Sequence, residues 1–436
     1  MTSEFPGKPC LFAAAFFGAV LFACQGAEVE AGFTSLFNGK DLAGWKLVGK
    51  KGEGYGVKDG VIYCAKGGGG NLFTEKEFAN FILRFEYKVE PGANNGIGIR
   101  APFEGTSSYQ GMEIQVLEDT AAQYAHLRPA QYNGSIYDVV PAKRVAQKPI
   151  GEWNSEEITA NGRGIEVVLN GQTIVAADLN TITDGPTLLK HPGLLRESGH
   201  IGFLGHNDYV EFRNIRVREL PSSDRDNTPP EGFKALFNGK DLAGWKGLLA
   251  PPLDNPIKRA ALSEEQRAAK QREADADMRA HWKAENGEIV FDGKGRSLCT
   301  AKDYGNFEMY VDWKIPPRGD SGIYVRGSPQ VQIWDPFTPG AKYNTAVGSG
   351  GLYNNKVNPA NPLKMADRPI GEWNRFRILM IGDKLHVFLN GELVVQNTTL
   401  ENYWDRKQPI FPSGQIELQN HGDKLWFKNI YIRELP

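Results

Sequence analysis

The sequence predicts an all-β protein built from two tandem β-sandwiches, and three observations support this prediction. The stretch FNGKDLAGWK occurs at residues 37–46 and again at residues 237–246. Apolar and polar residues alternate in LRFEYKV at 83–89 and VEFRNIRV at 210–217, which is the period of a half-buried strand. The chain has 436 residues, more than one hydrophobic core usually organises, so two domains are expected.

The first segment of the chain is typical of an export signal. Lys8 precedes the apolar run LFAAAFFGAVLFA at 11–23, which is short for a membrane span but fits the hydrophobic region of a secretory signal. A small residue precedes Cys24, as in bacterial lipoprotein signals, where the cysteine receives the lipid anchor. We expect residues 1–27 to be a signal peptide or a lipoprotein signal. The mature protein is then periplasmic or a membrane-anchored lipoprotein.

The net charge and the cysteine content limit the kinds of binding partner, disulfide and metal site that we expect. The net charge of −2 gives no reason to expect nucleic acid or an anionic membrane surface as a partner. Beyond the signal only Cys64 and Cys299 remain, and they do not occupy matching positions in the repeat. We expect lone thiols rather than a disulfide, and the absence of a CxxC pair argues against a structural zinc site.

The repeat extends through both halves in the same order. NNGIGIRAP at 94 corresponds to DSGIYVRGS at 320, KPIGEWN at 148 to RPIGEWN at 368, and HNDYVEFRNIRVREL at 206 to HGDKLWFKNIYIREL at 421. Preserved order indicates a duplicated domain. We place the copies at 31–220 and 233–436, with a polar, proline-rich linker at 221–232.

Turn and helix signals complete the outline. Asn170-Gly171 and Asn390-Gly391 predict tight hairpin turns, because both residue types tolerate positive φ. Trp45 and Trp245 are expected in the two cores. The second copy alone carries a charged insertion, 257–281, with a predicted helix over 262–280 that begins with a capping box. The insertion is either a solvent-exposed helix with no part in the site or a lid over a cleft.

Several motifs together resemble one known family. The opening FNGKDLAGW, the segments SGIYVRG and VQIWD, the strand PIGEWN and the closing FKNIYIREL are similar to the 3-keto-disaccharide hydrolase family. The resemblance covers nearly the whole mature chain, twice. It implies concanavalin A-like jelly rolls and a carbohydrate substrate already oxidised to a ketone at C3. Such a fold does not require that both copies are active.

Alternation along the strands indicates which polar side chains share the face that a jelly roll offers to a sugar. In the first copy the residues expected on this face are Arg100, Glu113, Gln115 and His206. In the second copy they are Tyr324, Arg326, Gln330, Gln332, Glu417 and His421. Acids, amides and guanidinium groups beside aromatic rings suit sugar hydroxyls. The alternative is that these residues form an ordinary solvated strand face.

Two more matched pairs flank this face. Glu118 and Asp335 follow the glutamine-bearing strands, and Tyr137 and Tyr353 lie in the loops GSIY and GGLY. Each tyrosine either stacks on a sugar or holds its loop. The candidate substrate-binding residues are Gln115, Glu118, Tyr137, Tyr324, Gln330, Gln332 and Tyr353.

The implied substrate opens a route that ordinary glycosidases, with two carboxylates flanking the bond, do not use. The ketone acidifies the C2 proton, so a base removes it, the enolate expels the C1 substituent and water adds back. In the first copy the base and the oxyanion holder are drawn from Glu113, His206 and Arg100. In the second copy they are drawn from His421, Glu417, Asp335 and Arg326.

Three questions stay open at the level of sequence. A divalent metal ion held by histidine and carboxylate would also stabilise an enolate. The main rival function is a non-catalytic carbohydrate-binding protein with the same fold. A mixed protein, with one active and one binding copy, is favoured by the replacement of Glu113 by Gln330 in the second copy.

Overall fold

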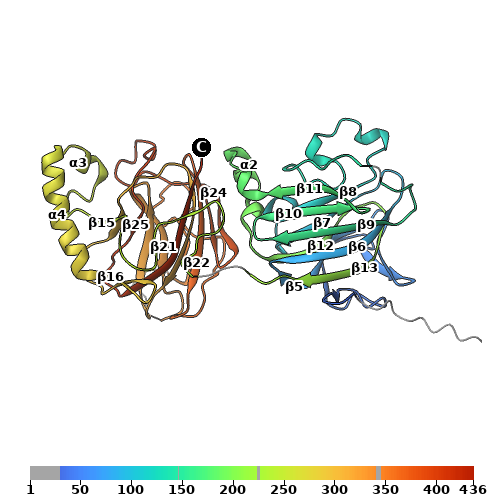
Figure 1. Cartoon of the computed structure of the whole chain (residues 1–436), viewed down its shortest axis with the longest axis horizontal. Coiled ribbons are helices and arrows are strands. Elements are labelled where there is room, and N and C mark those ends of the chain that lie inside the picture. The colour runs from blue at the N-terminus through green and yellow to red at the C-terminus, as the bar shows by residue number, and fades with distance from the viewer. Residues whose placement is uncertain (1–29, 146, 223–225, 340–344) are drawn as a thin grey trace, which may run out of the picture.

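The computed structural model describes residues 30–145, 147–222, 226–339 and 345–436, and its two lobes lie side by side along the longest axis of the molecule (Figure 1). The expected signal at 1–27, with Cys24, lies outside the described residues, as do residues 223–225 of the expected linker. Among the described residues, no helix has the length and apolar character needed to cross a membrane.

The first lobe is a sandwich of two antiparallel sheets. The larger sheet has the order β11 (Gln172–Asp178), β10 (Gly164–Leu169), β9 (Asn154–Asn161), β6 (Phe81–Val89), β13 (Val210–Glu219), β4 (Val61–Cys64) and β3 (Tyr55–Lys58), with β1 (Thr34–Ser35) also on β13. The five-stranded sheet has the order β2 (Trp45–Lys51), β5 (Gly69–Phe78), β12 (Gly199–His206), β7 (Asn94–Ala101) and β8 (Met112–Leu117).

The second lobe repeats this topology strand for strand. Its larger sheet has the order β24 (Glu392–Thr399), β23 (Lys384–Leu389), β22 (Asn374–Ile381), β19 (Phe307–Lys314), β26 (Leu425–Glu434), β17 (Glu288–Phe291) and β16 (Trp282–Glu285), with β14 (Lys234–Ala235) on β26. Its five-stranded sheet has the order β15 (Trp245–Gly247), β18 (Leu298–Thr300), β25 (Glu417–Leu418), β20 (Asp320–Val325) and β21 (Ser328–Trp334). The predicted fold class, two tandem jelly rolls, is confirmed.

Helices are few and short, with one exception. They are α1 (Ser107–Gln110), α2 (Gly185–Lys190), α3 (Pro256–Ala260) and α4 (Glu264–His281), together with 3₁₀ turns at Ala122–Tyr124, Pro129–Gln131, Leu179–Thr181, Pro192–Leu195 and Thr345–Val347. The exception, α4, begins with the predicted capping box between Ser263 and Gln266.

Local sequence signals explain the turns and the cores. Asn170 and Asn390 have φ of 49° and 53° at the β10–β11 and β23–β24 hairpins, as the Asn-Gly pairs predict. Trp45 and Trp245 are each 7% exposed and belong to the two cores. Cys64 and Cys299 are free, buried thiols.

The insertion packs against an edge of the second sandwich. Ala274 and Met278 of α4 are buried, and the carboxylate of Asp275 accepts the backbone N–H of Gly247 on β15 at 3.0 Å. Gly247 is required there, because a Cβ would lie 2.1 Å from the carbonyl oxygen of Ala274. In Figure 1, α3 and α4 form the outer tip of the second lobe.

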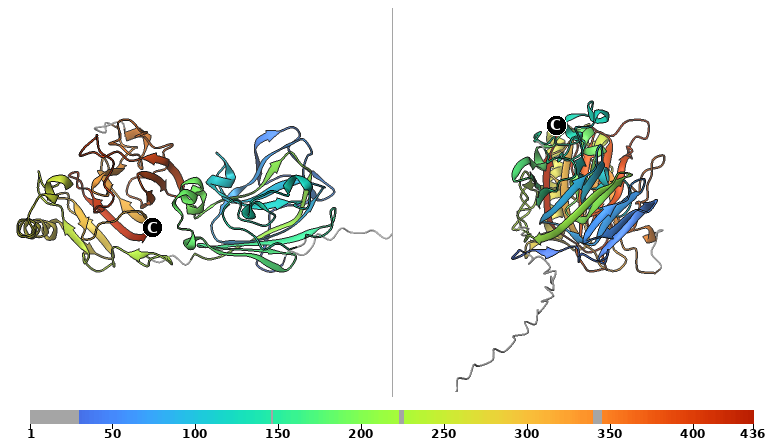
Figure 2. Two further views of the ribbon diagram at one scale, coloured as in Figure 1. Left: turned by 90° about the horizontal axis from the view of Figure 1, so that it is seen from above. Right: turned by 90° about the vertical axis from the view of Figure 1, so that its right-hand side faces the viewer.

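The two lobes share an apolar interface. The segment around α2 lies between them (Figures 1 and 2). Leu188 and Leu194 of the first lobe belong to one buried cluster with Phe388 and Leu393 of the second. Backbone carbonyls add polar ties, since the carbonyl of Leu189 lies 3.0 Å from Nε2 of His386. The lobes are therefore joined by a continuous core as well as by the linker.

Candidate active site on the second sandwich

Polar side chains run along the outward face of the five-stranded sheet in the second sandwich. This polar strip comprises Tyr324, Glu417, Gln419, Gln330, Gln332, Asp320 and His421. The strand alternation places them there, because the intervening residues Ile323, Val331 and Leu418 are fully buried on the core side.

Tyr324 and Glu417 form the centre of one end of the strip. They are direct partners in the ladder between β20 and β25, so their side chains leave the sheet next to each other. Glu417 is 5% exposed. Burial raises the pKa of its carboxyl to about 7, against the opposing effects of Ser297 and the charge of Arg259. At neutral pH this carboxyl therefore exchanges a proton readily.

The hydroxyl of Tyr324 is held by its neighbour. Nε2 of Gln419 donates a hydrogen bond to Oη of Tyr324 at 3.3 Å. Burial, and after it the charge of Glu417, raises the pKa of Tyr324. The phenol thus keeps its proton at neutral pH and can donate it to an acceptor on a ligand.

A hollow of about 250 Å³ opens over this pair. Tyr324, Glu417 and Gln419 line it from the sheet. Trp404 lines it as well, with its indole N–H donated to the carbonyl of Gly327 at 2.7 Å. Other lining residues come from the loop that leads into the insertion, namely Leu248, Leu249, Pro251 and Asp254. In the second copy, these loops therefore form one wall over the outward face of the five-stranded sheet.

The other end of the polar strip pairs an acid with a histidine. Nδ1 of His421 lies 3.3 Å from the carboxylate of Asp320. Nε2 of Gln332 donates to the same carboxylate at 2.8 Å, and Nε2 of Gln330 donates to Oε1 of Gln332 at 2.5 Å. Burial raises the pKa of Asp320, with the charge of His421 opposing the rise. A chain of amides therefore fixes the orientation of Asp320.

The first sandwich has no counterpart of the Tyr324–Glu417 pair. The matching positions are Gly98 and Gly202, and a Cβ on Gly202 would lie 2.3 Å from the ring of Phe73. Phe73 and Leu204 form a small apolar cluster on this face, against which Phe103 packs. Apolar side chains thus replace the acid and the phenol in the first copy.

Glu113, Gln115 and His206 lie on the corresponding face of the first sandwich. Nε2 of His206 is 3.7 Å from the carboxylate of Glu113. Glu113 is buried, and its Oε1 has no hydrogen-bond partner among the described residues. Nε2 of Gln115 donates to Oδ1 of Asn94 at 2.9 Å. The first copy therefore retains an acid–histidine pair at one end of the face.

The two arginines, by contrast, do not lie on the sugar-facing side, so their expected position is wrong. Arg100 is 1% exposed and Arg326 is 3% exposed. Each guanidinium donates to three backbone carbonyls and one asparagine side chain, which for Arg326 are Gly305, Gly382, Phe411 and Asn306. Both fasten loops at one end of a sandwich. We do not assign the oxyanion to either residue.

The matched acids Glu118 and Asp335 also have structural partners. The carboxylate of Glu118 accepts the backbone N–H groups of Gly92 and Thr120, and that of Asp335 accepts those of Arg318, Phe337 and Thr338. These bonds outweigh burial and lower the pKa of both acids. Both acids therefore anchor loops and stand outside the polar strip.

The two loop tyrosines differ from each other. Tyr137 is half-buried, and its hydroxyl accepts a hydrogen bond from Gln131 at 3.2 Å, while its backbone N–H bonds the carbonyl of Glu113. Tyr353 is 42% exposed and meets Trp334 edge to face at 5.5 Å. Tyr137 thus holds its loop against the strand of Glu113, and Tyr353 presents its ring to solvent.

Sequence reasoning did not select several lining residues. Gln419 alternates correctly with Leu418 but has Leu204 as its counterpart, so the repeat gave no support for it. Trp404 and Asp254 lie in loops, where no period indicates direction. Their only signal is an aromatic and an acid in segments that differ from the first copy.

The residues present offer limited support for a metal ion. No group of three or more histidine, cysteine, aspartate or glutamate side chains with metal-binding geometry occurs among the described residues. The pairs His206–Glu113 and His421–Asp320 each offer two such groups. Dependence on a divalent ion stays a prediction.

Comparison with known proteins agrees with this architecture. The model of the 3-keto-alpha-glucoside-1,2-lyase-like domain family matches residues 32–218 and again residues 232–433. A curated 3-keto-disaccharide hydrolase of Bacteroides thetaiotaomicron is 30% identical over 228 residues, which span 43% of this chain and 79% of that protein.

Solved structures of similar proteins cover one copy at a time. A candidate glycosyl hydrolase from Parabacteroides distasonis is 27% identical, with 43% of this chain and 99% of that chain covered and a TM-score of 0.38. A second one from the same organism is 25% identical, with 44% and 94% covered and a TM-score of 0.38.

Proposed function

Because the chain belongs to the family of 3-keto-alpha-glucoside-1,2-lyase-like domains, in two tandem copies, we propose that it cleaves 3-keto-glycosides and that the second copy carries the reaction. One observation supports this choice above the others. A buried carboxyl with a pKa of about 7, Glu417, faces a protonated phenol, Tyr324, in a hollow of about 250 Å³.

Glu417 is the proposed general base. The C3 ketone lowers the pKa of the C2–H bond, and a carboxylate poised near neutral pH removes that proton efficiently. The electron pair of the broken C–H bond forms a C2=C3 double bond, and the charge moves to the ketone oxygen. Tyr324 donates a hydrogen bond to this oxygen as the charge develops. Gln419 holds the phenol for that task.

The enolate then expels the C1 substituent. An electron pair on the enolate oxygen re-forms the C3=O bond, the C2=C3 pair becomes a C1=C2 double bond, and the C1–O bond breaks with its electrons leaving on the alcohol oxygen. The leaving alcohol takes a proton, which Glu417 now carries. Water adds its hydroxyl to C1 and its proton to C2, so the sum is hydrolysis of the glycoside without any net redox change.

The differences between the two copies favour a division of roles, with one catalytic copy and one sugar-binding copy. The first copy has Gly202 where Glu417 stands and Gly98 where Tyr324 stands, so it lacks both proposed groups. Its acid–histidine pair, Glu113 and His206, suits sugar binding without cleavage. We therefore propose that the first copy is a carbohydrate-binding partner of the second.

Export is proposed on the sequence of residues 1–27 alone. The apolar run and Cys24 support a periplasmic location, with or without a lipid anchor. Fractionation of cells that produce the full chain, and the same measurement with Cys24→Ser, separates the two cases. Retention of wild-type and variant chains in the cytoplasm would contradict export.

The activity is tested with a matched pair of substrates. The purified mature protein is incubated with a 3-keto-glucoside and with the unoxidised parent, each with and without a chelator. Release of the C1 alcohol from the keto form alone supports the proposal. Saturable binding without release supports the carbohydrate-binding alternative. Loss of activity with the chelator, restored by one divalent ion, assigns a metal to the reaction.

A further inference from the structure

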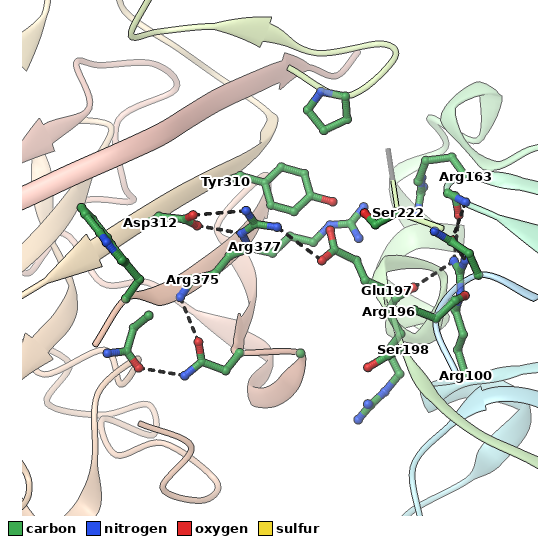
Figure 3. A pocket seen from close by; sticks show the side chains of 18 of the residues that line it. Arg100, Arg163, Arg196, Glu197, Ser198, Ser222, Tyr310, Asp312, Arg375 and Arg377 are labelled. Atoms are coloured by element: carbon green, nitrogen blue, oxygen red, sulfur yellow. Dashed lines mark hydrogen bonds and ion pairs between the residues drawn. The ribbon is translucent and has the colours of Figure 1, made fainter. Parts of the chain in front are cut away.

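A cavity of about 490 Å³ lies between the two sandwiches, and none of the polar-strip residues line it. Figure 3 shows side chains from both lobes pointing across it. Six arginines line this cavity: Arg100, Arg163 and Arg196 from the first sandwich, and Arg368, Arg375 and Arg377 from the second. The acids that line it are two, Glu197 and Asp312. Positive charge is therefore in excess.

Both acids are already engaged by one arginine. Asp312 accepts two hydrogen bonds from Arg375, at 2.7 and 3.1 Å, and Glu197 lies 3.8 Å from the same guanidinium. A third acid, Glu308, is fully buried outside the lining of the cavity and is shared by Arg377 and Arg433. The remaining arginines thus have few carboxylates to share.

Arg100 and Arg163 are the clearest cases. Both guanidinium groups donate to backbone carbonyls and asparagine oxygens, and no carboxylate among the described residues lies within 4.0 Å of either. Burial lowers the pKa of each to about 10, and the charge of Arg377 adds to this fall. The more distant charges of Glu197 at Arg100 and of Glu308 at Arg163 oppose it. Buried cations that repel one another are costly unless an anion accompanies them.

The second copy serves as an internal control. Arg326 is the counterpart of Arg100 and makes the same carbonyl bonds, but the residue matching Arg163 there is Asp383. The charge of Asp383 acts to raise the pKa of Arg326. The residue matching Arg196 is Phe411. The fold itself therefore does not require the extra arginines, which occur only where the first sandwich faces the cavity.

Fastening the two lobes accounts for part of this cluster. Arg377 donates to the carbonyl of Leu195 across the interface, and Arg433 donates to that of Asn180 at 2.6 Å. These bonds explain Arg377 and Arg433. Arg196 also reaches the second lobe, where its guanidinium lies 3.8 Å from the carboxylate of Glu392. Fastening does not explain the exposed Arg368, whose guanidinium bonds, among the described residues, only the carbonyl of Trp373 in its own lobe.

We propose that this cavity binds a small oxyanionic ligand of the size and chemistry of an acidic monosaccharide. Its carboxylate or ester oxygens accept hydrogen bonds from Arg163 and Arg196, whose planar forks match such groups. The half-buried Trp373 also lines the cavity, and the ammonium groups of Lys314 and Lys428 lie 4.6 and 4.8 Å from the centre of its ring, which adds positive charge beside this wall. This site is independent of the proposed cleavage at Glu417.

Calorimetric titration of the whole mature protein tests the proposal. The probes are glucuronate, glucose 6-phosphate and inorganic sulfate, with glucose as the uncharged control. At least one anionic probe should bind at least about tenfold more tightly than glucose. Arg163→Gln should weaken that binding by about tenfold or more, the usual effect of losing a charged hydrogen bond. The preferred probe identifies the ligand as carboxylate, phosphate ester or inorganic anion.

Three further variants make the outcome of the test unambiguous. Arg279→Gln makes the same charge change on an exposed face of α4 and should leave anion binding unchanged. Arg368→Gln alters the exposed rim and should weaken binding even if Arg163→Gln misfolds. Glu417→Gln should retain anion binding, which separates this site from the polar strip. Equal binding of all probes and glucose, or unchanged binding in both Arg163→Gln and Arg368→Gln, overturns the proposal.

Discussion

Glu417 and Tyr324 stand directly opposite each other on β25 and β20, so a buried carboxyl and a protonated phenol share one hollow. The pairing depends on strand register, because a slip of one residue in either strand would send that strand's side chain into the core. Burial raises the pKa of the Glu417 carboxyl to about 7, and a hydrogen bond from Gln419 holds the hydroxyl of Tyr324. One ladder position thus supplies both a base and a proton donor.

Glu417→Gln should lower kcat on a 3-keto-glucoside by about 10²- to 10⁴-fold, because the base is lost while the shape is kept. In the wild type, kcat/KM should rise with pH through about 7, as the raised pKa of Glu417 requires the ionised form to accumulate there. Initial rates between pH 5 and 9 measure both effects. A flat wild-type profile, or full activity in Glu417→Gln, contradicts the assignment.

Tyr324→Phe removes only the donor to the developing oxyanion. We expect kcat to fall by about 10²- to 10³-fold with a smaller change in KM, because this hydrogen bond strengthens as charge develops. Steady-state kinetics with the keto substrate provide the measurement. An equal loss through KM alone would make Tyr324 a binding residue instead.

The first copy should tolerate loss of its acid–histidine pair during turnover. Glu113→Gln and His206→Ala, made separately, should change kcat by less than about twofold, because the reaction is assigned to the second sandwich. They should weaken binding of a sugar ligand to the first sandwich. A loss of kcat comparable to that of Glu417→Gln would move the active site to the first copy.

Glu156 should make stability depend on pH. It lies in the first core where the second copy has Phe376, and neither carboxyl oxygen has a hydrogen-bond partner among the described residues. Burial raises its pKa from 4.5 to about 8. The folded state then binds the extra proton, so its contribution is complete below pH 4.5 and is lost as pH rises through about 8.

Glu156→Gln should therefore be more stable than the wild type at pH 8.5, by on the order of 2–4 kcal/mol, and nearly equal at pH 4.5. Urea unfolding at the two pH values measures the difference. Glu417 changes stability in the same direction, but it is present in both proteins and cancels. Parallel stability curves for the two proteins would count against a raised pKa at Glu156.

Arg326→Met should lower the free energy of unfolding by about 3–5 kcal/mol, since the buried guanidinium of Arg326 is lost and four acceptors lose their donor. Arg318→Met, a matched change outside the loop clamp, should cost less than about 1 kcal/mol. Denaturant midpoints compare the two. A midpoint for Arg326→Met equal to that of Arg318→Met would argue against the structural role.

Local rules predicted much of the fold. Asn-Gly pairs placed the hairpins because positive φ is a property of those two residues, and Ser263 and Gln266 placed the start of α4 because a cap is local. Alternation placed Tyr324, Gln332 and Glu417 on the outward face for the same reason. Each of these signals acts within a few residues.

The predicted orientation of the two arginines is wrong because the alternation of side chains along the strand is interrupted at their positions. Arg100 and Arg326 have φ of 47° and 52°, and the ladders of β7 and β20 shift register next to them. A residue in the left-handed region redirects its side chain, so both arginines turn to the end of the sandwich. No two-residue period contains that information. The hollow likewise depends on Trp404 and Asp254, which long loops bring to the sheet.

The leucines of the α2 region and the phenylalanine of β23 belong to one buried cluster, and this has a consequence for each half of the molecule. The two halves are copies of one domain, and each buries apolar side chains against the other. We expect one half, produced alone, to expose this apolar surface and to aggregate. A substitution in this shared cluster should therefore destabilise both halves together.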